Sequence, residues 1–256
     1  MKKAIRILLF VMLAGVFLYS AWQLGSYYLT AFRQEQTVSD LRDRLDENGE
    51  DPYAVNADGI LVRYADLYAQ NQDMVGWLTI EDTPIDYPVV QRKDDPEYYL
   101  HRDFNGDKAS AGSLFLDGTC DLERPSDNLI IYGHHMKSGK MFGKLQNYED
   151  KDFYEAHKTF VFDTIREHRE YQVLAVFRGQ AYAADDTEHF HYYDFINAKD
   201  QADFDGFVKQ VNRLSQYQTG VAAEYGDELL TLSTCAYHKE EGRFVVVAKR
   251  VVSPES

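Results

Sequence analysis

Three side chains that lie far apart in the chain have the types that covalent catalysis uses: a thiol, an imidazole and a guanidinium. Cys235 ends an apolar, strand-like run at residues 229–235. A thiol at a strand end is a candidate nucleophile when a neighbouring group lowers its pKa or accepts its proton. The competing interpretations are a buried structural cysteine and a disulfide with Cys120, which lies in a polar turn.

His134 is the candidate proton carrier. It follows an apolar run at residues 129–132 and Gly133, and we expect this glycine to permit a sharp turn that directs the next side chain off the strand end. Imidazole is the usual partner of a catalytic thiol because it exchanges protons near neutral pH. An ordinary loop histidine is the alternative, since the chain has eight histidines, and His135 is predicted to point elsewhere.

Arg243 begins the last predicted strand, eight residues after Cys235. A strand, a short loop and a second strand would return Arg243 to the neighbourhood of the thiol. A guanidinium there stabilises a thiolate or an oxyanion through donors that do not deprotonate. The alternative is a surface arginine; Lys249 and Arg250, further along the strand, are poorer candidates.

A metal centre is a weaker hypothesis. The pairs His134 with His135 and His189 with His191 each lack a convincing third ligand. Two cysteines are too few for a four-ligand zinc site or a disulfide scaffold. No metal is therefore predicted.

The elements that must position these side chains are mainly strands. From residue 75 onward, short apolar runs are separated by Gly, Pro, Asp and Asn, which predicts a β-barrel or sandwich. An amphipathic helix at residues 197–217 is expected to pack on the outside of that domain. The predicted strands lie within residues 77–80, 85–90, 113–116, 128–132, 159–162, 171–177, 229–232 and 244–252.

The N-terminus predicts a membrane anchor. Lys2, Lys3 and Arg6 precede an apolar stretch at residues 7–28, which reaches the roughly 20 residues needed to span a bilayer. The basic flank is expected in the cytoplasm and the remainder outside the cell. A cleaved signal peptide is the competing interpretation, but the apolar stretch is longer than is usual for one.

Three segments follow from these patterns. Residues 1–29 form a cytoplasmic stub and signal-anchor, residues 30–72 a helical stalk or appendage, and residues 73–256 the β-rich catalytic domain. Within the stalk, helical spacing is predicted at residues 30–50 and 58–72. A solvated spacer would explain the stalk equally well.

The charge excludes one class of partner. The formal net charge is −15, and the part after the anchor carries 24 basic and 42 acidic residues, a balance of −18. A protein that binds the phosphate backbone needs a basic face, so no nucleic-acid partner is predicted.

Several short motifs together resemble the class B sortases. TLSTC at 231–235, followed by Arg243 and FVVVAK at 244–249, is similar to the active-site end of a sortase. YGHHM at 132–136, with Met-Phe at 141–142, resembles the histidine motif of class B. VGWLTI at 75–80, IDYPVVQ at 85–91 and YYL at 98–100 are also similar. The chain departs from the class where an amide side chain often follows Tyr-Leu, because His101 stands there.

The resemblance implies an eight-stranded β-barrel and a membrane-bound cysteine transpeptidase that needs no cofactor. In that family, the residue matching Cys235 attacks the Thr carbonyl of a sorting motif, His134 would match the acid/base, and Arg243 the arginine that holds the substrate and oxyanion. Tyr132, Ser233 and Thr234 would line the substrate groove.

The partners implied by the resemblance are a secreted surface protein and an amine of a peptidoglycan peptide. The surface protein would carry a C-terminal sorting motif of the Asn-Pro-x-Thr-x or Ser/Pro-Pro-x-Thr-Gly type. Three alternatives stay open: a pilin-polymerising sortase, a thiol hydrolase, and a non-enzymatic, membrane-tethered barrel with a Cys120–Cys235 disulfide.

Overall fold

Eight strands close into a barrel in the computed structural model, which describes residues 2–47, 51, 53–183, 185–235 and 242–252. The order around the barrel is β1-β2-β3-β4-β7-β8-β6-β5. Closure confirms the predicted barrel and excludes an open sandwich. The strands are β1 Met74–Thr79, β2 Asp86–Val90, β3 Leu114–Leu116, β4 Asn128–Gly133, β5 Thr159–Thr164, β6 Glu170–Gln180, β7 Leu229–Cys235 and β8 Gly242–Arg250.

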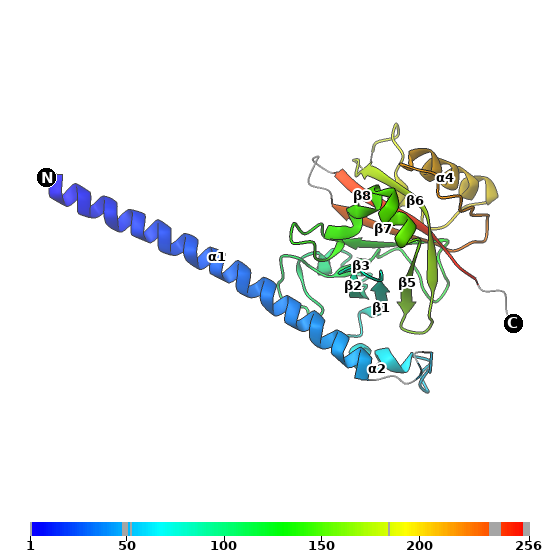
Figure 1. Ribbon diagram of the computed structural model, residues 1–256, viewed down its shortest axis with the longest axis horizontal. Helices are drawn as coiled ribbons and strands as arrows, with labels where there is room; N and C mark the ends of the chain where they lie inside the picture. Colours follow the sequence, from blue (N-terminus) through cyan, green and yellow to red (C-terminus); the bar gives the residue numbers. More distant parts are fainter. Residues whose placement is uncertain (1, 48–50, 52, 184, 236–241, 253–256) are drawn as a thin grey trace.

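The continuous apolar run of β8 follows from burial on both of its faces. Phe244 and Val246 belong to the core cluster inside the barrel. Val245 and Val247 point the other way, into a second cluster beneath α4 (Gln201–Leu214). The predicted helix at residues 197–217 therefore packs on the outside of the barrel, as Figure 1 shows.

The remaining helices lie mostly at the N-terminal side and in the loops. They are α1 Lys2–Glu47, α2 Val62–Gln70 and α3 Lys151–Ala156, with 3-10 helices η1 Tyr98–His101, η2 Phe142–Glu149 and η3 Tyr192–Asp194. The apolar stretch and the predicted stalk helix at residues 30–50 form one continuous helix, α1. Its C-terminal part is buried through Leu41 and Leu45 in a cluster with Leu67 of α2 and Trp77 of β1.

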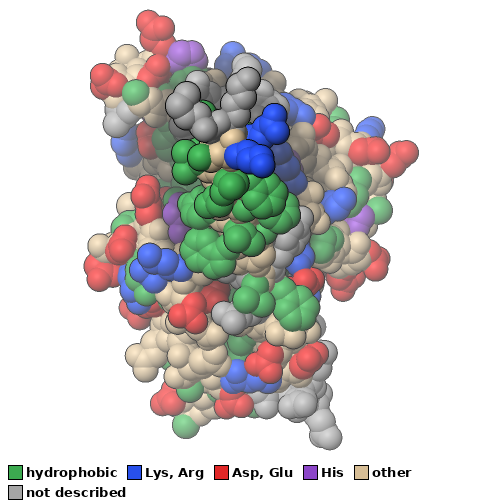
Figure 2. Space-filling view, turned by 90° about the vertical axis from the view of Figure 1, so that its left-hand side faces the viewer, with side chains coloured by type: hydrophobic (Ala, Val, Ile, Leu, Met, Phe, Trp, Pro, Cys, Tyr) green, Lys and Arg blue, Asp and Glu red, His purple; other side chains and the backbone are tan. Residues whose placement is uncertain are grey.

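The N-terminal half of α1 projects away from the barrel (Figure 1). Residues Lys3–Gln23 are long and apolar enough to cross a membrane, and none of that window is buried. Figure 2 looks at this side of the molecule and shows hydrophobic side chains gathered at the front, with acidic side chains scattered around them. An apolar surface of this size requires a cover of lipid or protein.

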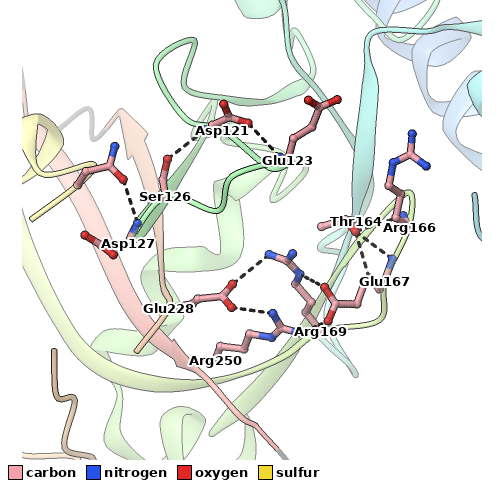
Figure 3. Close-up of polar contacts among 11 residues, drawn as sticks. Asp121, Glu123, Ser126, Asp127, Thr164, Arg166, Glu167, Arg169, Glu228 and Arg250 are labelled. Atoms are coloured by element: carbon pink, nitrogen blue, oxygen red, sulfur yellow. Dashed lines mark hydrogen bonds and ion pairs between the residues drawn. The ribbon is translucent and has the colours of Figure 1, made fainter. Parts of the chain in front are cut away.

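Ion pairs tie strands together at one end of the barrel (Figure 3). The Arg169 side chain, 5% exposed, contacts Glu167 at 2.9 Å and Glu228 at 3.3 Å. Arg250 contacts Glu228 at 2.8 Å and also pairs with Glu167. The cluster joins the β5–β6 turn, the start of β7 and the end of β8, so it lies at the barrel end opposite Cys235.

Candidate active site

The three catalytic candidates are brought together by the register of adjacent strands. β4 and β7 are parallel and pair Gly133 with Thr234, so their C-terminal ends meet. β7 and β8 are antiparallel and pair Cys235 with Arg243. His134, Cys235 and Arg243 therefore leave the barrel at one end. The side chain of Cys235 and residues 236–241 lie outside the described residues.

A cleft of about 330 Å³ opens at this end of the barrel. Four of the predicted site residues line it, namely Tyr132, His134, Ser233 and Arg243, together with Pro96, Glu97, Leu100, Phe115, Asp117, Gly118 and Gly133. Thr234, 1% exposed, is absent from this lining. Successive side chains of a strand point to opposite faces, so Thr234 faces away from Ser233 and does not contribute to the cleft wall.

Gly133 is required for a reason other than the predicted sharp turn. It is the last residue of β4, and it is not among the glycines with positive φ. A Cβ built there would lie 2.7 Å from Cδ2 of Phe142 and would also overlap Leu114. Both neighbours are fully buried. Close packing under His134, rather than a positive φ, disfavours a larger residue at position 133.

The ring of His134 is held on its edge and on its face. Nε2 lies 2.8 Å from the carbonyl oxygen of Leu100. A carbonyl only accepts, so Nε2 carries a proton, and Nδ1 is the nitrogen that remains to exchange one. His101 stacks on the ring, with centroids 5.6 Å apart and planes at 19°. Burial lowers the pKa of His134, the Leu100 bond opposes that shift, and the charge of His101 adds to it.

The other cleft residues have polar partners of their own. The Tyr132 hydroxyl donates to Asp117 Oδ2 at 3.2 Å, and burial together with that carboxylate raises the pKa of Tyr132. The hydroxyls of Ser233 and Tyr192 are 2.7 Å apart. These two hydrogen bonds hold the Tyr132 and Ser233 hydroxyls in place in the cleft wall.

The loop that follows His134 is fixed at several points. The carbonyl of His134 accepts from the Phe142 amide at 3.0 Å, and His135 forms a bridge with Met141. Lys140 forms an ion pair with Glu35 of α1 at 2.6 Å. His135 does not line the cleft, which agrees with its predicted orientation away from the site.

Four contacts of the cleft residues were not predicted from the sequence. Leu100 and His101 of η1 contact His134. Asp117, after β3, contacts Tyr132, and Tyr192 of η3 contacts Ser233. The Tyr-Tyr-Leu motif at 98–100 and the departure at His101 were noted only as part of the family resemblance, and neither indicated a contact with His134. The others are common residue types in polar loops, so no local pattern distinguishes them.

The alternative of a Cys120–Cys235 disulfide is excluded. Cys120 is a free, fully buried cysteine whose Sγ lies 3.7 Å from the carbonyl oxygen of Asn128. Asn128 pairs with Leu229, at the opposite end of β7 from Cys235. Six strand residues span about 20 Å, whereas a disulfide needs Cα atoms within about 7 Å. Burial raises the pKa of Cys120 to about 12.

The second pair of histidines is engaged by carboxylates. His189 Nδ1 lies 3.0 Å from Asp186, and His191 Nδ1 lies 3.1 Å from Asp194. Hydrogen bonds from His189 lower the pKa of Asp186 to about 2. Within the described part of the chain, no group of three or more His, Cys, Asp or Glu side chains is arranged to hold a metal ion.

Comparisons with known proteins show the family of the chain. The sortase domain family matches residues 78–251. Sortase B of Listeria monocytogenes is 39% identical over 240 residues, covering 93% of each chain. Sortase B of Staphylococcus aureus is 35% identical over 189 residues, covering 73% of this chain and 74% of the relative. A Staphylococcus aureus sortase B–substrate complex superposes with a TM-score of 0.77 at 28% identity, covering 87% of this chain and 98% of that one. The chain belongs to the sortase family and is a class B cysteine transpeptidase.

Proposed function

We propose that this transpeptidase cleaves a sorting motif after its Thr residue and transfers the surface protein to an amine of peptidoglycan. The proposal depends mainly on the strand register. β4 and β7 end at the same side of the barrel, and Cys235 of β7 pairs with Arg243 of β8 beside a cleft. A cleft of about 330 Å³ is within the range of sites that hold small ligands or short peptide segments.

In the first step, Nδ1 of His134 accepts the proton of the Cys235 thiol. The thiolate attacks the Thr carbonyl carbon, a C–S bond forms, and the carbonyl oxygen becomes an oxyanion. The protonated Nδ1 then donates to the leaving amine as the C–N bond breaks. The products of this step are a thioacyl-enzyme and the released C-terminal fragment of the substrate.

In the second step, the accepting amine attacks the thioester carbonyl. His134 Nδ1 removes a proton from that amine, and Cys235 leaves as the thiolate and regains its proton from the imidazolium. The lowered pKa of His134 suits this role because the ring is neutral and ready to accept a proton near pH 7. The bond from Nε2 to Leu100 keeps the same tautomer through the cycle.

Arg243 is proposed to stabilise the oxyanion and to hold the substrate. It lines the cleft and is half-buried, where a fixed cation is more effective than in bulk water. Tyr132 and Ser233 line the same cleft and are proposed to contact the peptide.

The N-terminal part of α1 is proposed to anchor the enzyme. Lys2, Lys3 and Arg6 would remain in the cytoplasm, and the barrel would lie outside the cell. There it meets secreted substrates with a C-terminal motif of the Asn-Pro-x-Thr-x or Ser/Pro-Pro-x-Thr-Gly type. The Lys140–Glu35 pair ties the histidine loop to the same helix.

Intact mass spectrometry of the full-length enzyme in detergent micelles tests the proposal. Incubation with a panel of Thr-containing sorting peptides, with and without triglycine, should give a thioester on Cys235 and an amine-dependent ligation product. Cys235→Ala should give neither, whereas Cys120→Ala should give both, because the Cys120 side chain is fully buried and does not line the cleft. Ligation by Cys235→Ala would refute the covalent mechanism.

A further inference from the structure

The imidazole of His101 has a position that the proposed reaction does not account for. Its ring stacks on that of His134, with centroids 5.6 Å apart and planes at 19°. The two residues come from different elements, since His101 ends η1 and His134 follows β4. His101 is exposed and lines a shallow hollow with Glu97, Tyr98, Arg102, Lys108, Ala109 and Ser110. His134 lines the catalytic cleft instead.

We propose that His101 is a positioning residue for His134: its ring covers one face of the His134 imidazole, and a positive charge on it would oppose a second positive charge on His134. The proposal rests on the proposed function for its catalytic meaning. Two imidazolium charges at this separation repel each other even in a water-like dielectric. Interacting groups of this kind lose their protons in steps that belong to the pair rather than to either ring.

The charged surroundings do not cancel that repulsion. Around His134, the cleft contains the carboxylates of Glu97 and Asp117 and the guanidinium of Arg243. Around His101, the hollow contains Glu97, Arg102 and Lys108. Glu97 lines both spaces, and the phenols of Tyr132 and Tyr98 are the other ionisable groups among the described lining residues. Among the described residues, three cations and two carboxylates line the two spaces, so these groups do not neutralise a second imidazolium.

The geometry also limits how the His134 ring can rotate. The Leu100 carbonyl holds one edge and the neighbouring residue His101 covers one face, so a single short helix contributes both contacts. A ring restrained in this way keeps Nδ1 directed consistently. His101 thus has two separable effects on His134, one through charge and one through stacking.

Two substitutions separate these effects. His101→Phe keeps a flat ring for stacking and removes the charge, whereas His101→Asn removes both. His168→Asn is the matched control. His168 contacts Asp163 at 2.7 Å in the β5–β6 turn, at the barrel end away from the cleft.

The experiment is an NMR titration of the full-length protein in micelles with ¹³C-labelled histidine, together with kcat/KM against pH. We expect both His101 variants to raise the titration midpoint of His134 by roughly half a unit to one unit. The acid limb of kcat/KM should move by the same amount. His168→Asn should leave the midpoint unchanged. At the pH optimum, we expect His101→Phe to keep kcat within about twofold and His101→Asn to lose about tenfold, since a misdirected catalytic group is costly.

An unchanged His134 midpoint in both His101 variants would overturn the coupling. Full kcat in His101→Asn would overturn the positioning role. The titration is independent of turnover. A wild-type enzyme that shows the coupled titration but no acyl transfer with any peptide would therefore count against the proposed function and not against the pairing of the two rings.

Discussion

Gly133→Ala links core packing directly to catalysis. The new Cβ would lie 2.7 Å from Cδ2 of Phe142 and would also overlap Leu114, and both of these residues are fully buried. Carbon atoms pack best at about 3.5–4.0 Å, so the end of β4 or its neighbours must yield by about 1 Å. His134 is the next residue, and it moves with the strand end.

The magnitudes follow from that displacement. Overpacking a tight core typically costs about 1–3 kcal/mol of unfolding free energy, which lowers Tm by about 2–4 °C per kcal/mol in a domain of this size. A catalytic group misplaced by about 1 Å loses on the order of 100-fold in rate. We therefore expect a modest loss of stability and a much larger loss of kcat.

Urea unfolding and single-turnover acylation measure the two effects separately. Gly206→Ala is the matched control, because a Cβ at Gly206 on α4 meets nothing within 4 Å. That control should gain about 0.5–1 kcal/mol from helix propensity and keep its activity. A Gly133→Ala enzyme with wild-type stability and wild-type acylation would refute the packing argument.

Three further substitutions test other parts of the molecule. Arg243→Lys should lower kcat/KM for peptide turnover by about 100-fold or more, because an ammonium does not replace a planar guanidinium at an oxyanion. A fully active Lys variant would show that the proposed role of Arg243 is wrong. His134→Ala should abolish acylation measured by intact mass, whereas His135→Ala should keep much of it, and the reverse order would mean that the wrong histidine was chosen. Tyr64→Phe should cost about 1.5–3 kcal/mol in urea unfolding with normal turnover, because the buried Tyr64 hydroxyl donates to the carboxylate of Asp163 at 2.7 Å; an unchanged midpoint would count against that bond.

Much of the fold can be predicted from local patterns. Each of the eight observed strands overlaps a predicted apolar run, and α4 at Gln201–Leu214 lies within the predicted helix. These predictions succeed because alternation, helical spacing and turn residues act over a few neighbours in the chain. The helical spacing predicted at residues 58–72 likewise contains α2 at Val62–Gln70.

Other features depend on contacts between distant residues. The Cys120–Cys235 pairing was open from the sequence and is excluded only by the register of β4 with β7. Thr234 belongs to the active-site motif, yet the pleat of β7 turns it away from the cleft. Gly133 was expected to permit a turn, and its actual constraint comes from Leu114 and Phe142 on either side.

The sequence by itself determined the three candidate residue types, their order, and the strand ends on which they stand. Only the tertiary structure decided their geometry. The parallel pairing of β4 with β7 joins segments about a hundred residues apart, and η1 supplies the two contacts that hold His134. Such long-range contacts are selected by closure of the barrel and by core packing, which no local propensity encodes.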